Sequence, residues 1–229
     1  MIVPANIFRR RLILKSIYCL CFLSLLRAAA SPLAADPLAV GGFSTVGLDG
    51  WEDKVFAGQT AYRLVDLEGR TVLSADSRGS ASGLVKKMRV DLKKHPYLNW
   101  RWRIENRLAI DDETVKSGDD YAARVYVVVS GGLLPWRTRA VTYVWASGAA
   151  RGDSWENAFA GKNVQMLALR DRRDRLSTWY AEKRNVYQDL KQLFGAEIQF
   201  IDAVAVMTDT DNSDGHASAF YGDIYFSKE

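Results

Sequence analysis

The 229-residue chain has little cysteine or histidine, and this limits both how it can be stabilised and what it can bind. Its cysteines are Cys19 and Cys21, near the N-terminus, and its histidines are His95 and His216. Zinc sites are built mainly from cysteine and histidine, so a zinc site is excluded. Disulfide bonds within the body of the chain are excluded as well. The fold must therefore be held together by its apolar core.

The chain also lacks an apolar run of about 20 residues, the length needed to cross a membrane. Its most apolar run, residues 17–26, is shorter and follows basic residues between positions 9 and 15. Alanines at 28–30 come next. This order predicts a signal peptide over residues 1–35. The alternative is a lone anchor helix, against which the early end of the run at Arg27 counts. We expect a periplasmic or secreted protein with no membrane span after cleavage.

The basic excess that nucleic-acid binding requires is missing from the rest of the chain. The whole sequence has 31 basic and 27 acidic residues, a formal charge of +4. Five of the basic residues and none of the acidic ones fall within the predicted signal peptide, which leaves a charge of −1 for the rest. We therefore expect no nucleic-acid partner.

Motifs of well-known catalytic sites are missing too. The stretches GFSTVG and GSASG do not have the G-x-S-x-G pattern of a hydrolase nucleophile, and no glycine-rich phosphate loop opens a helix. Glycoside hydrolysis depends on the distance between two carboxylates in space, which the sequence does not give. A glycan-acting hydrolase or lyase thus stays an alternative, with Asp120 or Glu182 as acid or base and Arg124 orienting the substrate.

What the sequence does contain is a succession of short apolar and aromatic segments, such as TAYRLVD, AARVYVVVS, RAVTYVWAS and IQFIDAVAVMTD. Turn residues separate them, as in LEGR and KSGDD. This pattern predicts an all-β fold, an antiparallel β-sandwich formed by residues 36–229 as a single domain. One segment differs: Val186, Leu190 and Phe194 recur at helical spacing before Gly195, which predicts one short helix across an end of the sandwich.

Strand alternation predicts which side chains of the segment YLNWRWRI face the core. Its apolar face consists of Leu98, Trp100, Trp102 and Ile104. Arg101 and Arg103 lie on the other face. We interpret the two tryptophans as core residues rather than as rings that stack on sugars.

Arg124 interrupts the apolar segment YAARVYVVV. Alternation places Arg124 and Tyr126 on one face. The opposite, apolar row consists of Tyr121, Ala123, Val125, Val127 and Val129. A buried guanidinium without a partner is strongly destabilising. We therefore expect Arg124 on the concave face, paired with a carboxylate from a set of four: Asp119, Asp120, Glu182 and Asp189.

Seven segments resemble, in their order, a family of secreted bacterial proteins known as domain of unknown function 3047. They are ASGL, LNWRWRI, GDDYAARVYV, YVW, AEKRNVYQDL, MTDTDN and FYGDIYF. The resemblance covers nearly the whole chain after residue 35 and implies an exported protein of no established activity. More remotely, the LNWRWRI strand and the ending FYGDIYF are similar to carbohydrate-binding modules with a galactose-binding-like jelly roll. That similarity implies the jelly-roll form of the sandwich.

The candidate ligand-binding residues combine guanidinium, carboxylate and aromatic groups, which suit an acidic or hydroxyl-rich ligand on one concave sheet face. They are Arg101, Arg103, Asp119, Asp120, Arg124, Tyr126, Trp145, Glu182 and Arg184. The alternative is a network of ion pairs with a purely structural role.

The loop MTDTDNSDG offers the oxygen ligands that calcium prefers, with Asp209, Asp211 and Asp214 as candidates. It is not an EF-hand, because Asp214 stands where that loop needs glycine and Phe220 where it needs glutamate. A calcium site of another type and a self-capping turn are the two interpretations. No other cofactor is predicted.

The sequence as a whole favours an exported, non-catalytic module that binds a carbohydrate or another polar or acidic ligand. The alternatives are the glycan-acting enzyme and a structural or interaction module of the cell envelope. A pocket around Arg124, Tyr126 and Trp145 would favour binding or catalysis, whereas a flat apolar patch would favour docking.

Overall fold

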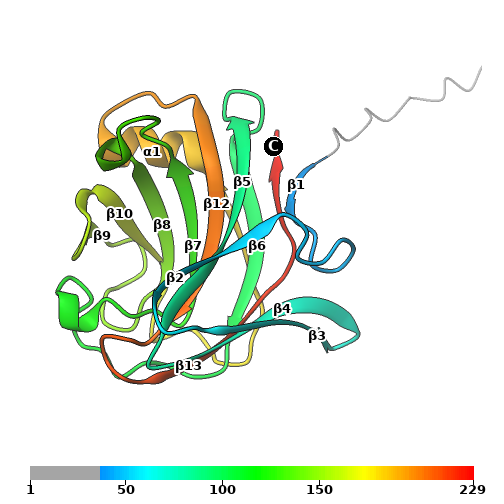
Figure 1. Ribbon diagram of the computed structural model, residues 1–229, viewed down its shortest axis with the longest axis vertical. Helices are drawn as coiled ribbons and strands as arrows, with labels where there is room; N and C mark the ends of the chain where they lie inside the picture. The colour runs from blue at the N-terminus through cyan, green and yellow to red at the C-terminus, as the bar shows by residue number, and fades with distance from the viewer. Residues whose placement is uncertain (1–36) are drawn as a thin grey trace, which may run out of the picture. The chain divides into compact units, whose positions relative to one another are not determined.

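Two facing β-sheets and one α-helix make up the part of the chain that the computed structural model describes, residues 37–229 (Figure 1). The predicted signal peptide lies outside the described residues. The prediction of a β-sandwich of jelly-roll form with one short helix is confirmed. Within residues 37–229, no helix has the length and apolar character needed to cross a membrane.

The first sheet, sheet A, is arranged around β6. Its strands are β1 (Leu38–Gly41), β3 (Ala61–Leu67), β4 (Arg70–Arg78), β6 (Tyr97–Ile104), β11 (Tyr180–Asn185), β13 (His216–Tyr221) and β14 (Ile224–Ser227). β13 and β14 pair with successive halves of β6, and β11 also pairs with β6. β4 and β3 extend the sheet beyond β13, and β1 pairs with β14.

The second sheet, sheet B, carries the candidate site. In spatial order its strands are β2 (Trp51–Ala57), β5 (Ala81–Asp91), β12 (Phe200–Asp209), β7 (Arg124–Val129), β8 (Arg139–Trp145), β10 (Gly161–Arg170) and β9 (Ser154–Asn157). Its neighbours are antiparallel except β8 and β10, which are parallel. The parallel pair departs from the predicted antiparallel sheet. It arises because β9 and β10 form an antiparallel hairpin, and β10, the second strand of that hairpin, lies beside β8 in the same direction.

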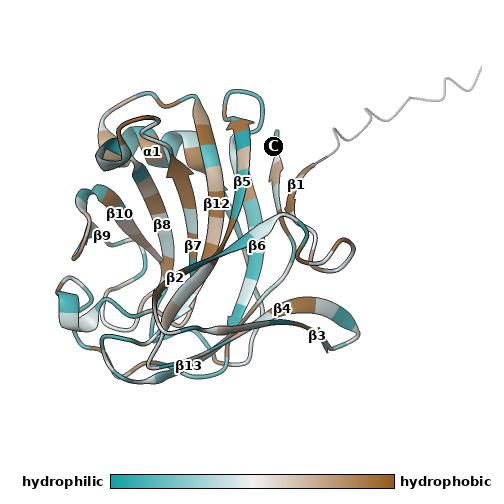
Figure 2. Cartoon of the chain, viewed as in Figure 1, coloured by the Kyte–Doolittle hydropathy of each residue, from teal (hydrophilic) through white to brown (hydrophobic). Residues whose placement is uncertain are grey.

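Aromatic side chains from both sheets meet in the core. Trp100 of β6 contacts Tyr143 of β8 at a ring-centroid distance of 5.2 Å, and Trp102 contacts Trp145 at 5.9 Å. All four apolar residues of the β6 segment are buried, which confirms the alternation and the core role of both tryptophans. Apolar residues also dominate β7 and β8 (Figure 2).

The helix α1 (Val186–Phe194) lies across one end of the strands, as predicted (Figure 1). It begins at Asn185, whose side chain accepts a hydrogen bond from the Gln188 amide at 3.1 Å. It ends at Gly195, whose φ of 64° is the left-handed conformation that glycine adopts without strain. Val186 and Leu190 bury one face of the helix in the core.

The apolar row predicted for residues 121–129 holds from Ala123 onward, since Ala123 lies in the main core cluster. Val125 and Val127 enter the core, as expected. The prediction for Tyr121 is wrong, because β7 begins at Arg124 and the segment before it is irregular. Tyr121 instead packs with Val144 and other side chains in a second, smaller apolar cluster.

Candidate binding groove on sheet B

A hollow of about 390 Å³ lies on the face of sheet B that points away from sheet A. It reaches from Phe56, at the end of β2, to Phe159, in the turn between β9 and β10. Arg124 and Tyr126 of β7 and Met207 of β12 line it between these rings. We call this hollow the sheet B groove. It crosses the strands, so its lining comes from segments far apart in the sequence.

Small side chains on this face leave room for the groove. Strand alternation sends Val206 into the core and turns Ala205 and Met207 outward. Gly83 of β5 lies opposite Met207, where a Cβ would come within 3.3 Å of the Met207 Cβ. Ala81, also on β5, lines the groove directly.

Arg124 is built into the inner wall of the groove. It is 4% exposed, and one of its terminal nitrogens donates to a carboxylate oxygen of Asp209. The other lies 3.8 Å from a carboxylate oxygen of Asp119. The guanidinium also lies over the rings of Tyr121 and Tyr126, at 4.7 and 5.7 Å from their centroids. Arg124 is thus a buried cation paired with Asp209 and Asp119, and its Nε has no hydrogen-bond partner among the described residues.

The predicted pairing of Arg124 is confirmed for Asp119, one of the four expected carboxylates. Its main partner, Asp209, was not among them. Burial is the largest single influence and acts to lower the pKa of Arg124, but the neighbouring groups, Asp209 first and then Tyr126 and Asp119, together raise that pKa above its ordinary value. The guanidinium therefore stays charged at every pH at which the protein is folded.

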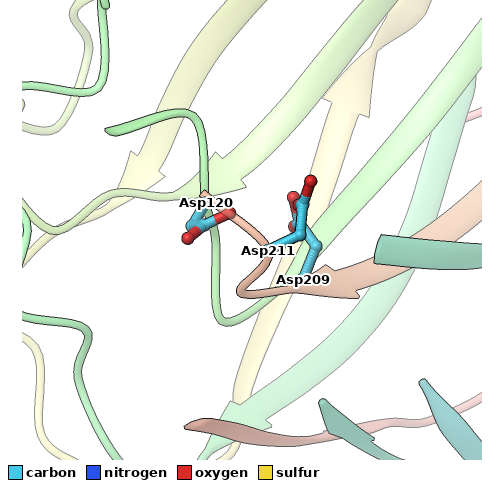
Figure 3. A group of neighbouring side chains, drawn as sticks. All are labelled: Asp120, Asp209 and Asp211. Atoms are coloured by element: carbon cyan, nitrogen blue, oxygen red, sulfur yellow. The ribbon is translucent and has the colours of Figure 1, made fainter. Parts of the chain in front are cut away.

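Three carboxylates gather beside this arginine. Oxygen atoms of Asp120, Asp209 and Asp211 lie within 4.8 Å of one another (Figure 3). Asp120 belongs to the segment before β7, and the other two lie at and just after the end of β12. Of the predicted calcium ligands, the structure brings Asp209 and Asp211 together, whereas Asp214 is not in this group and Asp120 takes its place.

Each buried member of this carboxylate group is held by amide hydrogens. Asp120 accepts from the Ser213 amide at 2.7 Å and from the Asn212 amide at 3.1 Å. Asp209 accepts from the Tyr121 amide at 3.3 Å. These contacts fix the turn after β12 against the segment before β7. The turn is therefore capped by Asp120 from a distant segment, and not by its own side chains as the self-capping interpretation expects.

Burial and mutual repulsion raise the pKa values of several of these carboxylates. Burial is the main cause at Asp209, and the neighbouring carboxylates add to it, so its pKa lies well above the ordinary 3.8. Burial also raises the pKa of Asp119, against the opposing charge of Arg124. At Asp211 burial and the charge of Asp120 raise the pKa together. The folded protein therefore holds protons at this group more tightly than the unfolded chain does.

We predict that the protein becomes more stable as the pH falls from 7 to 5. An aspartate whose folded-state pKa is raised takes up its proton in the folded state first, so stability rises as pH falls towards the unfolded value near 3.8. A carboxylate with a lowered folded-state pKa, such as Asp171, stabilises the fold while it is ionised, and this stabilisation is lost only at a pH below the range from 7 to 5. Urea unfolding in chelator, at pH 7 and pH 5, measures the change. Asp211→Asn should reduce it, whereas Asp214→Asn, in the same loop but outside the group, should not. A wild type that loses stability over this range would contradict the prediction.

The predicted calcium site stays a prediction, with Asp120, Asp209 and Asp211 as its donors. Calcium would relieve the same repulsion, since it prefers clustered carboxylate oxygens. The melting temperature at pH 7 should rise in millimolar calcium and fall in chelator, and Asp211→Asn should weaken this response. An identical melting temperature under both conditions would leave only the turn-forming role.

The other predicted ligand residues do not join the groove. Arg101 and Arg103 lie on the outer face of sheet A. The Arg101 guanidinium carbon lies 4.6 Å from the ring centroid of Trp179, and a guanidinium nitrogen of Arg103 lies 2.7 Å from a carboxylate oxygen of Glu68. Trp145 is a core residue, 2% exposed, so its placement in a binding site is wrong. The alternation of β8 turns its ring towards Trp102 of sheet A.

Glu182 and Arg184 lie at the edge between the sheets, which corrects the prediction that they share a face with Arg101. Because Glu182 pairs in register with Trp100, it lies on the core side of sheet A. It accepts from the Trp102 indole at 3.0 Å and pairs with Arg170. Arg184 pairs with Asp189 of α1. These residues line a separate hollow of about 350 Å³ beside α1.

The aromatic rims of the groove were missed in the sequence. Phe56 and Phe159 are 65% and 57% exposed. Both begin a Phe-Ala-Gly triplet whose glycine has a positive φ, 62° at Gly58 and 55° at Gly161. A glycine with positive φ marks a turn, where a nearby aromatic side chain is not drawn into the core by strand alternation. This repeated triplet is the signal that could have revealed the two rings.

Solved structures similar to this chain include two carbohydrate-binding modules and a xyloglucanase domain. The family 11 carbohydrate-binding module of Clostridium thermocellum is 10% identical over 86% of this chain and 97% of its own, with a TM-score of 0.46. The family 30 module of a cellulosomal cellulase from the same organism is 10% identical over 85% and 94%, with a TM-score of 0.44. The xyloglucanase domain of the effector NopAA from Sinorhizobium fredii is 10% identical over 78% and 93%, also at 0.44.

These similarities carry no argument about the ligand of this chain. Among curated proteins, none matches the sequence. A family model described as "Protein of unknown function (DUF3047)" matches residues 49–225.

Proposed function

Because the chain belongs to the DUF3047 family, whose description names no function, we propose its role from its own residues: it is a non-catalytic module that binds a neutral carbohydrate in the sheet B groove. The sheet B groove has an aromatic ring at each end and polar side chains along its sides. Ligand sites typically combine such apolar surfaces with a few fixed polar groups.

The observation that carries the proposal is the pair of exposed phenylalanines at the two ends of the groove. Phe56 and Phe159 are more than half exposed, so neither contributes much to the core. Both line the same hollow. Flat aromatic rings bury large apolar areas at low entropic cost, and the apolar C–H faces of sugar rings offer a matching surface.

The charges of the groove select against an acidic ligand. Asp119, Asp209 and Asp211 line it, and the one cation among its lining residues, Arg124, is already paired. Two lysines, Lys54 and Lys116, lie outside this lining over the rings of Phe56 and Phe159. An anionic ligand beside the aspartates would add to the repulsion that already raises the pKa of Asp211. Sugar hydroxyls, by contrast, donate to carboxylates and to the side-chain amide oxygen of Asn212. The ligand class is therefore narrowed from polar or acidic to neutral and hydroxyl-rich.

The geometry favours binding over catalysis. The candidate acids of the enzyme alternative are engaged in the structure, Asp120 by amide hydrogens and Glu182 by Arg170 and Trp102. A general acid or base must be within hydrogen-bond reach of its substrate proton. Glu182 also lies outside the sheet B groove, in the hollow beside α1.

A screen of the purified protein on an array of neutral and acidic glycans tests this function, followed by a product assay on each glycan bound. We expect binding to neutral glycans with no product. If no neutral glycan binds, or if acidic glycans bind best, the proposal is wrong. A product released from a bound glycan would support the enzyme alternative instead.

A further inference from the structure

The loop between β7 and β8 projects two large apolar side chains into solvent. Leu133 is 98% exposed and Trp136 is 69% exposed, the two highest fractions among the exposed large apolar residues of the described chain. They belong to the sequence Leu-Leu-Pro-Trp, residues 133–136, which we call the apolar tip. The tip lies at the end of the sandwich that carries α1 (Figure 1). Apolar side chains that stay in solvent contribute little to the stability of the fold. Their exposure therefore indicates that a binding partner covers them.

The backbone of the tip is held in place by hydrogen bonds. The Leu134 amide donates to Gly131 at 3.1 Å, and the side chain of Asn163 donates to the Trp136 carbonyl at 3.0 Å. Pro135 opens a short 3₁₀ turn, Pro135–Arg137. At Gly131, a Cβ would come within 2.2 Å of the Leu134 carbonyl oxygen, so this turn requires glycine. The tip is thus presented in a fixed conformation, which lowers the entropic cost of binding.

Two arginines adjoin the apolar tip. Arg137 follows it directly and is exposed, and Arg139 opens β8 and lines the same hollow as Trp136. We call these two residues the basic collar. The neighbouring carboxylate of Asp202 is already engaged, by the Ser130 amide and by Arg89. The surroundings of the tip are therefore positively charged.

We propose that the apolar tip and basic collar dock the protein on an anionic phospholipid surface. Tryptophan prefers the boundary between headgroups and acyl chains, and an adjacent leucine can reach the acyl region. Arginine and lysine near that boundary attract anionic headgroups. Two side chains of this kind bury roughly 400 Å² at most, about half of what each partner of a stable protein interface buries. Reversible docking on lipid, by contrast, requires only a small apolar insertion helped by charge.

The proposed docking leaves the sheet B groove open. The groove lies at Arg124, where β7 begins, and the tip follows Val129, where β7 ends. The two surfaces are therefore at opposite ends of one strand. Lipid docking and carbohydrate binding can fail independently of each other.

Co-sedimentation with phospholipid vesicles tests the proposal. At low salt, the protein should sediment with vesicles of phosphatidylglycerol and phosphatidylcholine in equal parts, and much less with pure phosphatidylcholine. The double variant Leu133→Ser/Trp136→Ser should lower the bound fraction about tenfold or more. Arg137→Gln/Arg139→Gln should abolish the preference for phosphatidylglycerol. Because all four side chains are at least partly exposed, the melting temperatures should stay close to that of the wild type.

The matched control is Val46→Ser/Leu64→Ser, which removes two other exposed apolar side chains, 62% and 38% exposed. It should bind vesicles as the wild type does. Absence of wild-type binding, or an equal loss in the control, would overturn the proposal. So would a dimer, seen by sedimentation equilibrium without lipid, that the tip variant dissociates, because the tip would then be covered by a second copy of the chain.

Discussion

Arg124→Met should destabilise the protein by about 3–5 kcal/mol. Methionine can fill most of the space of the arginine stem, so the loss comes from charge. The substitution leaves Asp209, 1% exposed, without its cation in a buried position. Once the guanidinium is gone, the Tyr121 amide, at 3.3 Å, is the remaining hydrogen-bond donor to the Asp209 carboxylate among the described residues. An uncompensated buried charge is among the most destabilising changes in a protein.

Urea unfolding of the variant and the wild type at pH 7 measures this effect. Arg101→Met is the matched control, since Arg101 is also a strand arginine stacked on an aromatic ring but has no ion pair within residues 37–229. It should change the free energy of unfolding by about 1 kcal/mol or less. The double variant Arg124→Met/Asp209→Asn should recover part of the loss, because both charges are then removed. A loss below 1 kcal/mol for Arg124→Met would mean that the pair does not stabilise the fold.

Phe56→Ala/Phe159→Ala should lower the affinity for a neutral glycan about tenfold to a hundredfold. Each ring removed takes away apolar contact worth about 1–1.5 kcal/mol to a stacked partner, and tenfold in affinity corresponds to about 1.4 kcal/mol. The free energy of unfolding should change little, because both rings are more than half exposed. Calorimetric titration with the best glycan of the array and urea unfolding separate the two effects.

Tyr225→Ala is the control for this pair. Tyr225 is 38% exposed and lies on β14 of sheet A, away from the groove. Its removal should leave the affinity unchanged. Equal losses of affinity in Tyr225→Ala and in the phenylalanine variant would indicate that the glycan does not bind in the sheet B groove.

Local patterns in the sequence were enough to predict the helix and most strands of this fold, although β1, β2 and β9 were missed. The period-two pattern of the LNWRWRI segment identified the core face of β6, because it depends only on backbone geometry. The period of α1 and the glycine after it set the helix ends within a residue. The parallel pairing of β8 with β10 was beyond such reasoning, since it depends on where a hairpin joins the sheet.

The site was harder to predict because it depends on pairing between distant strands. Asp209 reaches Arg124 across 85 positions in the sequence, and β12 is brought beside β7 only by the order of strands in sheet B. Glu182 was placed on the wrong face for the same reason: a shift of one residue in strand register turns every side chain to the other face. Asp119 and Tyr126 were placed correctly because they lie next to Arg124 in the sequence.

The central claim is that a neutral carbohydrate binds in the sheet B groove. A crystal structure of the protein with the best neutral oligosaccharide of the array tests it most directly. We predict sugar rings between Phe56 and Phe159, with hydroxyl groups hydrogen-bonded to Asp211 or Asn212. An oligosaccharide bound in the hollow beside α1, or on the outer face of sheet A around Arg101, would contradict the claim.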